Sequence, residues 1–205
     1  YLELLQKAGA FRRSFVQFHR LKPKDQLHIH RHRPDLLFPQ PHRDIVKNVE
    51  KMGLVSSALI YSIMKQESGF DPKARSHADA FGLLQLIPQV AQSAAKRLPS
   101  TAYQKADDLY DPQVAIPLGA ENLHQLFKNL KRNFILSVAS YNASETAVKS
   151  WVKSRYQGDP VAFIEDIPYE ETKGYIKLVM RNYISYNRLQ SPKNEKFYFP
   201  ESCLE

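Results

Sequence analysis

The amino-acid sequence predicts a mainly α-helical fold with one small β-hairpin or turn element. After Pro41, apolar residues recur three or four positions apart along most of the chain, which is typical of helices that bury one face. Residues 70–87 are the exception, because Gly, Pro, Ser and Asp gather there as they do in turns. The chain has 205 residues, 43% of them hydrophobic, so it can form one or at most two domains with a sizeable core.

The first forty residues differ from the rest of the chain. An apolar stripe over the first twenty residues predicts one amphipathic helix. From Leu21 to Arg43 that period is lost and four prolines interrupt the chain, which predicts a linker or an extended wrap rather than a helix. The stripe consists of Leu4, Leu5, Ala8, Phe11, Phe15 and Phe18.

Three histidines alternate within the predicted linker, at His28, His30 and His32. On a strand, alternate positions share a face and could hold a metal ion. However, no carboxylate or thiol stands at ligand spacing, and Arg31 and Arg33 add positive charge. A solvated basic loop is therefore favoured over a metal site, and the sequence predicts neither a metal nor a cofactor.

The main helical region follows the linker. The stripe around Val49 predicts a helix that ends at Gly53, and Ser56 and Ser57 are good N-cap residues for a second helix through about Gln66. Pro88 and the pair Asp111-Pro112 are further helix starts. Additional helices are predicted over residues 134–141, 144–154, 159–165 and 169–189.

The charge balance excludes some classes of protein and leaves the partner open. The 29 Lys and Arg outnumber the 21 Asp and Glu by eight, which favours nucleic acid, anionic lipid or an acidic polymer as partner. The single Cys203 excludes an intrachain disulfide and a cysteine-based zinc cage. No stretch approaches the roughly 18 apolar residues of a membrane span. Because the chain starts at Tyr1, we expect a mature form or a fragment, and Leu204-Glu205 could be a cloning remnant.

Glu67 is the residue that breaks the helical pattern. It stands seven positions after Ile60, on the stripe that also contains Ile63 and Met64. Burial at the end of an apolar face raises a carboxyl pKa and favours the protonated acid that general acid catalysis needs. In the alternative reading, the helix ends there and Glu67 turns into solvent or caps a turn against Lys65 or Lys73.

Four short segments in order along the chain decide between these readings. The first two contain Glu67, Ser68, Pro72, Ser76, Gly82, Leu83, Gln85 and Pro88. The third is Ser140-Tyr141-Asn142-Ala143-Ser144, and the fourth is Ile167-Pro168-Tyr169-Glu170-Glu171-Thr172-Lys173-Gly174-Tyr175. In order and spacing these resemble the four motifs of the bacterial soluble lytic transglycosylases of family 1, whose fold is goose-lysozyme-like (α+β, lysozyme-like). The resemblance covers about residues 40–189 and makes Glu67 the expected catalytic residue.

Several residues depart from the motifs of that family. Asp79 and Ser144 stand where glycine is usual, and Asp tolerates left-handed backbone better than most residues. Leu84 and Ile87 replace two methionines of an apolar wall. Lys173 replaces arginine, so a bidentate contact there is in doubt.

The resemblance implies a reaction and a set of partners. The reaction is cleavage of the β-1,4 bond between N-acetylmuramic acid and N-acetylglucosamine in peptidoglycan, ending in a 1,6-anhydromuramyl product, with Glu67 as general acid and then base. Peptidoglycan glycan strands are the expected partner rather than nucleic acid, with cell-wall or divisome proteins as further partners. The resemblance also implies a monomer located in the periplasm or cell envelope.

The resemblance assigns supporting roles around Glu67. Tyr141 would hydrogen-bond and orient Glu67, and Asn142 would steady the same turn. Ser76 and Gln85 would hold sugar hydroxyl or acetamido groups, and Glu171 would line the floor of the cleft beside the hairpin. Tyr175 is a further candidate for the site, whereas Tyr186 is expected in the core. From spacing alone, Tyr141 could instead be a core aromatic and Ser76 a turn cap.

The sequence also predicts how the chain is organised and leaves rival functions open. Residues 1–40 are expected to be the N-terminal helix and linker, which we interpret as a remnant of a preceding helical domain. Residues 41–190 are the expected catalytic domain, and 191–205 a tail. The rivals are a lysozyme-type hydrolase, a non-catalytic peptidoglycan-binding module on the same fold, and a nucleic-acid-binding helical domain. A hydrolase with two carboxylates needs a second acid, for which Asp71, more often a turn residue, and Asp79 are nearest in sequence.

Overall fold

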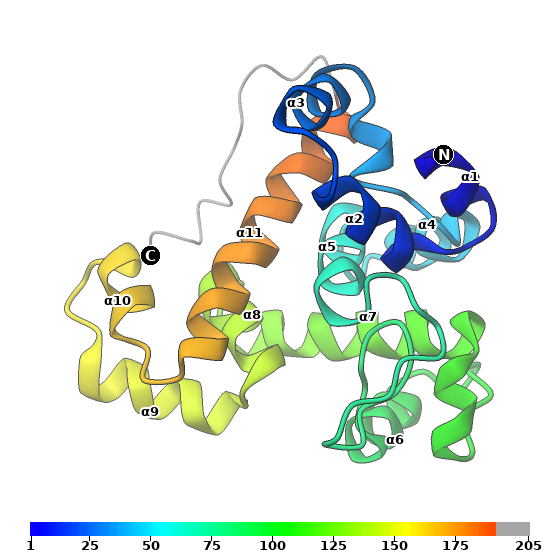
Figure 1. The fold of residues 1–205 in the computed structure, drawn as a ribbon. Coiled ribbons are helices and arrows are strands. Elements are labelled where there is room, and N and C mark those ends of the chain that lie inside the picture. The colour runs from blue at the N-terminus through cyan, green and yellow to red at the C-terminus, as the bar shows by residue number, and fades with distance from the viewer. Residues whose placement is uncertain (192–205) are drawn as a thin grey trace.

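The computed structural model describes residues 1–191 and has the mainly α-helical fold that the sequence predicts (Figure 1). Within these residues the β structure consists of two isolated bridges, and no helix is long and apolar enough to cross a membrane. Residues 192–205 lie outside the described residues. They include Cys203, the Leu204-Glu205 pair and nearly all of the predicted tail 191–205.

The N-terminal residues form three helices instead of one helix and a linker. α1 (Leu2–Lys7) and α2 (Phe11–His19) replace the single predicted helix, because Gly9 between them has a φ of 72° and ends the helical path. The predicted linker conformation is wrong as well, since Pro23–His32 forms α3. Pro23 occupies the first helical position, where proline is favourable. α3 buries none of its residues, so it lacks the apolar stripe from which a helix is predicted.

The three alternating histidines therefore do not share a strand face. The rings of His28 and His32, one helical turn apart, lie 4.7 Å from each other, while the ring of His30 lies 6.4 Å from that of Phe18. Among residues 1–191, no group of three His, Cys, Asp or Glu side chains is placed to hold a metal ion.

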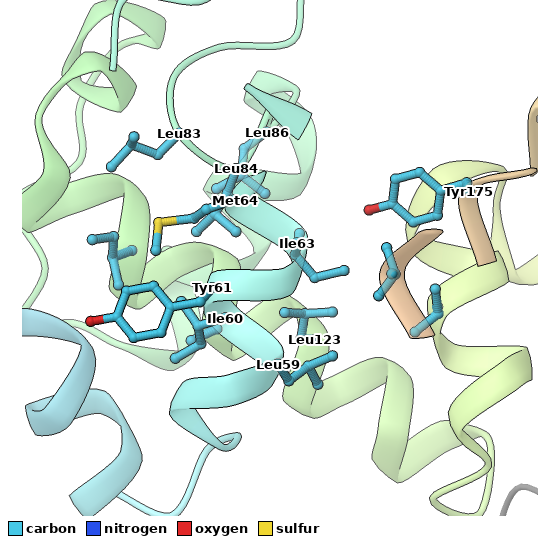
Figure 2. Close-up of a cluster of buried hydrophobic side chains, with 14 of the residues drawn as sticks. Leu59, Ile60, Tyr61, Ile63, Met64, Leu83, Leu84, Leu86, Leu123 and Tyr175 are labelled. Atoms are coloured by element: carbon cyan, nitrogen blue, oxygen red, sulfur yellow. The ribbon is translucent and has the colours of Figure 1, made fainter. Parts of the chain in front are cut away.

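The next two helices confirm the predicted ones and build the centre of the core. α4 (Arg43–Lys51) is followed by α5 (Ser57–Glu67), whose N-cap Ser56 accepts a hydrogen bond from the Leu59 amide at 3.3 Å. The eight residues of α5 from Ser57 to Met64 are all buried. α5 packs along α11 (Glu170–Gln190), and Figure 2 shows the apolar side chains gathered around it.

The segment that follows α5 is the predicted hairpin or turn element. Backbone bridges join Arg75 to Phe81 and Phe81 to Leu86. Asp79 has a φ of 52°, so aspartate holds a left-handed turn at the position where the family motif has glycine. This element begins directly after Glu67 and therefore places polar groups near the end of α5.

The remaining helices also confirm the predicted ones. Pro88 opens α6 (Pro88–Arg97), and Asp111 caps α7 (Pro112–Asn129) by accepting the Gln113 amide at 2.8 Å. The other helices are α8 (Phe134–Asn142), α9 (Glu145–Arg155), α10 (Pro160–Asp166) and two 3-10 helices, η1 (Pro34–Leu36) and η2 (Ala106–Tyr110). Figure 1 shows α9 and α10 on one side of α11, and α6 with the hairpin on the other.

Two apolar clusters hold these helices together. The main cluster contains α5 and its neighbours from Val46 to Tyr186. A small second cluster belongs to the N-terminal helices, and Phe38 packs against both clusters. The second cluster consists of Leu2, Phe18, Leu36 and Leu37.

Gly82 in the hairpin is predicted to be irreplaceable on two grounds. Its φ is 72°, and a Cβ built there would lie 2.0 Å from the Leu109 carbonyl oxygen. We expect Gly82→Ala to destabilise the protein by about 3 kcal/mol or more in urea unfolding, through left-handed strain and overpacking together. Gly53→Ala is the matched control, because Gly53 has a φ of 73° with nothing within 4 Å. The control should cost only about 1 kcal/mol, and equal losses for the two variants would contradict the packing argument.

Candidate active site

Glu67 is the last residue of α5 and continues its buried face. Ile60, Ile63 and Met64 on that face are 0% exposed, and Glu67 itself is partly buried. Burial disfavours the charged carboxylate, and it is the main reason that the pKa of Glu67 rises from 4.5 to about 7. The negative charge of Glu171 raises this pKa further. A large share of Glu67 therefore keeps its proton near neutral pH.

The alternative in which Glu67 turns toward a lysine is wrong. Lys65 Nζ donates a hydrogen bond to the Leu37 carbonyl oxygen at 2.8 Å. Lys73 Nζ lies 5.3 Å from the ring centre of Tyr110. Both lysines thus have partners other than the Glu67 carboxyl.

Tyr175 on α11 is the hydrogen-bond partner of Glu67. Its hydroxyl donates to Glu67 Oε1 at 2.6 Å, and Figure 2 shows the Tyr175 ring with its hydroxyl directed toward α5. This bond favours the ionised carboxylate and lowers the pKa of Glu67, against the larger effect of burial. Burial, reinforced by the Glu67 charge, raises the pKa of Tyr175 well above its ordinary value, so the phenol remains a proton donor.

Tyr141 does not make the hydrogen bond to Glu67 that the resemblance implied. Its hydroxyl donates to the Leu84 carbonyl oxygen at 2.8 Å instead. Burial raises the pKa of Tyr141 well above its ordinary value, and the negative charge of Glu67 raises it further. Tyr175 therefore takes the orienting position, and Tyr141 ties the end of α8 to the hairpin.

Asn142 links the end of α8 to the first turn of α11. Its Oδ1 accepts a hydrogen bond from Thr172 Oγ1 at 2.6 Å, and its Nδ2 donates to Glu171 Oε1 at 3.5 Å. Glu171 is exposed, while Thr172 is buried. Sequence reasoning gave Thr172 no role, although it stands next to Glu171 in the fourth motif. Through these two hydrogen bonds, Asn142 and Thr172 help to place the carboxylate of Glu171, whose charge acts on Glu67.

Ser76 and Gln85 both serve the backbone of the hairpin. Ser76 Oγ accepts hydrogen bonds from the amides of Ala78 and Ala80 at 3.2 and 3.1 Å. Ser76 therefore caps this turn, which was the alternative to sugar binding. Gln85 has a φ of 47°, and its Nε2 donates to the carbonyl oxygens of Ala74 and Gly82 at 3.2 and 3.0 Å. A contact of either residue with sugar stays a prediction.

Ser68 is a structural residue that sequence reasoning missed. Its Oγ donates to the Leu83 carbonyl oxygen at 2.9 Å and accepts the Phe70 amide at 3.1 Å. Its place directly after Glu67 in the first motif could have indicated a structural role. Ser68 and Tyr141 thus hold two successive residues of the hairpin, Leu83 and Leu84, beside the end of α5.

The two aspartates considered as a second acid are engaged elsewhere. Asp71 Oδ1 accepts the Lys73 amide at 2.9 Å, as expected for a turn residue. Asp79 is exposed and pairs with Arg75 at 2.6 Å. Glu171, and neither aspartate, is the carboxylate whose charge acts on the pKa of Glu67.

The other departures from the motifs have clear structural settings. Leu84 is fully buried, whereas Ile87 is 39% exposed and so does not continue the expected apolar wall. Ser144 caps α9 by accepting the Ala147 amide at 3.2 Å. Lys173 Nζ pairs with Glu170 Oε1 at 2.8 Å within the first turn of α11, in place of a bidentate contact.

A cavity of about 780 Å³ lies at the other end of α5 and is distinct from the Glu67 site. Its walls include Ser56 and Leu59 at the start of α5 together with Tyr183 of α11. At 1.5 Å per residue the start of α5 is roughly 15 Å from Glu67. None of the predicted site residues lines this cavity.

Comparisons with known proteins show the family of this chain. A sequence model of the family described as "Transglycosylase SLT domain" matches residues 44–164. The chain belongs to this family. The SLT domain family match thus includes Glu67, Ser76, Gln85, Tyr141 and Asn142, and it ends before Tyr175.

Curated relatives of this SLT domain chain are much longer proteins. The soluble lytic murein transglycosylase of Escherichia coli K12 is 34% identical over 152 residues, which cover 74% of this chain and 23% of the relative. A putative soluble lytic murein transglycosylase of Haemophilus influenzae is 36% identical over 151 residues, covering 72% and 25%. The chain therefore spans about a quarter of the length of these relatives.

Solved structures of SLT proteins have the same fold. An inactive mutant of the lytic transglycosylase Slt from Pseudomonas aeruginosa matches with a TM-score of 0.82 and 25% identity, over 100% of this chain and 31% of that one. The 70 kDa soluble lytic transglycosylase of Escherichia coli matches with a TM-score of 0.72 and 31% identity, over 76% and 25%. These matches agree with the lysozyme-like fold that the motifs implied.

The Tyr175 hydrogen bond is predicted to restrain the pKa of Glu67. Because the phenol stabilises the carboxylate, Tyr175→Phe should raise the pKa of Glu67 above 7 by about one unit. The measurement is a pH titration of the Glu67 carboxyl carbon by ¹³C NMR. Tyr141→Phe is the matched control, since its hydroxyl donates to Leu84. An unchanged or lowered pKa in Tyr175→Phe would contradict the assignment.

Burial of Glu67 is also predicted to make folding weaker at high pH. A pKa raised from 4.5 to about 7 means that the folded state binds more protons between these values, so stability falls as pH rises through them. We expect Glu67→Gln to lose less stability than wild type between pH 4.5 and pH 8.5, by about 3 kcal/mol in urea unfolding. Glu170→Gln, which changes an exposed carboxylate paired with Lys173, should keep the wild-type trend. Parallel losses in wild type and Glu67→Gln would show that the carboxyl is not desolvated.

Proposed function

We propose that this chain is the catalytic part of a peptidoglycan lytic transglycosylase, with Glu67 as its general acid and then its base. The observation that carries the proposal is a single carboxyl at the end of a buried helix, with a pKa of about 7 and a tyrosine hydroxyl 2.6 Å away. Such a group can donate a proton near neutral pH and take one back in the next step. The names of the relatives, lytic murein transglycosylases, support the same substrate.

In the first step Glu67 protonates the oxygen that links N-acetylmuramic acid to N-acetylglucosamine. The bond from C1 of muramic acid to that oxygen breaks, and the N-acetylglucosamine leaves with the proton as a free hydroxyl. The acetamido oxygen of the muramic acid stabilises C1, as in substrate-assisted glycosidases. Tyr175 would then stabilise the carboxylate that Glu67 has become, because its hydroxyl favours the ionised form.

In the second step the Glu67 carboxylate takes the proton of the muramic acid C6 hydroxyl. That oxygen forms the new bond to C1 and gives the 1,6-anhydro end, so no water is consumed and Glu67 regains its proton. A second protein base is unnecessary in this scheme. The partners of Asp71 and Asp79 support a scheme without a second base. Asp71 accepts the Lys73 amide, and Asp79 pairs with Arg75.

The organisation and setting of the enzyme belong to the same proposal. Residues 41–190 would form the catalytic domain, and 1–40 an N-terminal segment that has a small apolar cluster of its own and also packs Phe11, Phe15 and Phe38 against the main cluster. Peptidoglycan strands in the periplasm or cell envelope are the proposed partner, with Ser76, Gln85 and Glu171 contacting sugar. A 70 kDa soluble lytic transglycosylase that matches this chain with a TM-score of 0.73 has been solved in complex with bulgecin A. The proposed enzyme acts as a monomer without a cofactor, and cell-wall or divisome proteins are its further partners.

Digestion of purified sacculi followed by mass spectrometry of the released muropeptides tests the proposal. Wild type should release products whose reducing ends are lighter by one water than hydrolysed ends. Glu67→Gln should lower release by at least about 100-fold, because the proton donor is lost. Glu165→Gln, an exposed carboxylate that pairs with Lys177, is the control and should match wild type.

Three results would contradict the proposal in different ways. Hydrolysed ends would indicate a lysozyme-type hydrolase. Binding of wild type to sacculi without release of products would indicate a non-catalytic peptidoglycan-binding module. Undiminished release by Glu67→Gln would place the chemistry on another residue.

A further inference from the structure

The turn that follows Glu67 has an uncommon backbone conformation. Gly69 and Phe70 are both left-handed, with φ of 60° and 68°. Glycine adopts this region readily, but a bulky aromatic residue does so only where its surroundings hold it there. Phe70 is 1% exposed and stands three residues after the proposed acid. The groups that hold this turn therefore affect where the Glu67 carboxyl points.

The hairpin holds the inner side of the turn. Ser68 Oγ donates to the Leu83 carbonyl oxygen and accepts the Phe70 amide, at 2.9 and 3.1 Å. These two bonds fix the backbone of the turn against the hairpin, but they leave the Phe70 ring to be held by other contacts.

Helix α2 holds the outer side of the turn. The ring of Phe11 meets that of Phe70 edge to face, with centroids 5.6 Å apart, and the ring of Phe15 lies 6.2 Å from it. The stem of Arg12 covers Gly69, since a Cβ built at Gly69 would lie 2.9 Å from Arg12 Cγ. Figure 1 shows α2 beside α5. One face of α2 thus covers both left-handed residues.

The same region also holds the last turn of α5. Lys65 Nζ lies 3.7 Å from the ring centre of Phe15 and donates to the Leu37 carbonyl oxygen at 2.8 Å. Lys65 stands two residues before Glu67, and Gly69 two residues after it. The N-terminal segment therefore contacts the chain on both sides of the carboxyl, although α2 lies outside the residues 44–164 that define the SLT match.

We propose that α2 holds the turn after Glu67 in its left-handed conformation, and that Phe11 and Phe15 are positioning residues for the Glu67 carboxyl. The proposal rests on the proposed function only in so far as Glu67 is the acid. Without these rings the turn relaxes, water reaches the end of α5, and the carboxyl loses its fixed direction. The chemical step then slows, while substrate binding changes little.

The test compares the double variant Phe11→Ala/Phe15→Ala with Val16→Ala, which alters an exposed residue of the same helix. We expect kcat of the double variant to fall about 10- to 100-fold, because small displacements of a catalytic group have effects of this size. KM should change by less than about twofold. The pKa of Glu67, measured by ¹³C NMR of its carboxyl, should fall from about 7 toward 4.5, since burial is what raises it.

Two further variants keep the result interpretable. Phe11→Leu/Phe15→Leu retains apolar side chains of similar reach and should restore most of kcat and of the Glu67 pKa. If the double alanine variant does not fold, Phe11→Ala alone removes one ring contact and is assayed in the same way. An unchanged Glu67 pKa in a folded alanine variant would overturn the proposal, whatever its kcat.

The titration separates this proposal from the proposed function. The Glu67 pKa can be measured without turnover, so it reports on α2 even if wild type releases no muropeptides. Failure of release by wild type would remove the proposed function. An alanine variant that leaves the Glu67 pKa unchanged would remove the role of α2.

Discussion

The desolvation of one carboxyl between α5 and α11 is the constraint on which the rest of the site depends. Glu67 ends a helix whose preceding face is fully buried, and burial raises its pKa to about 7. Tyr175 compensates part of this effect with a hydrogen bond of 2.6 Å. The balance leaves a group that can release and recover a proton near neutral pH, which is the property that a one-carboxyl mechanism requires.

The surrounding contacts serve to hold the end of α5 in a fixed place. Ser68 and Tyr141 bind successive carbonyl groups of the hairpin, and Asn142 joins α8 to the first turn of α11. On the outer side, Lys65 Nζ lies over the ring of Phe15, and that ring is tilted against the ring of Phe70. Most polar residues of the motifs therefore bind backbone or one another, whereas Tyr175 binds the Glu67 carboxyl.

Helices that bury an apolar face could be predicted from the sequence, because their period is visible in the chain itself; α5 and α11 are examples. α3 could not, since it buries none of its residues and the prolines at its start and just after its end, Pro23 and Pro34, indicate an interrupted chain. Glu67 could be predicted as the acid from the four motifs, whereas its place on the apolar stripe alone left the solvent-facing alternative open. Its partner could not, because Tyr141 and Tyr175 both stand in motifs, and only the packing of α11 on α5, 108 positions away along the chain, brings Tyr175 to Oε1.

In the proposed reaction, only the protonated form of Glu67 can donate the proton that starts cleavage. The most direct measurement is the pH dependence of muropeptide release beside the NMR titration of the Glu67 carboxyl in the same protein. We expect the rate of muropeptide release to fall as pH rises, with a midpoint near pH 7 that equals the NMR titration midpoint of the Glu67 carboxyl. Release that continues undiminished well above the pH at which Glu67 has lost its proton would contradict the account.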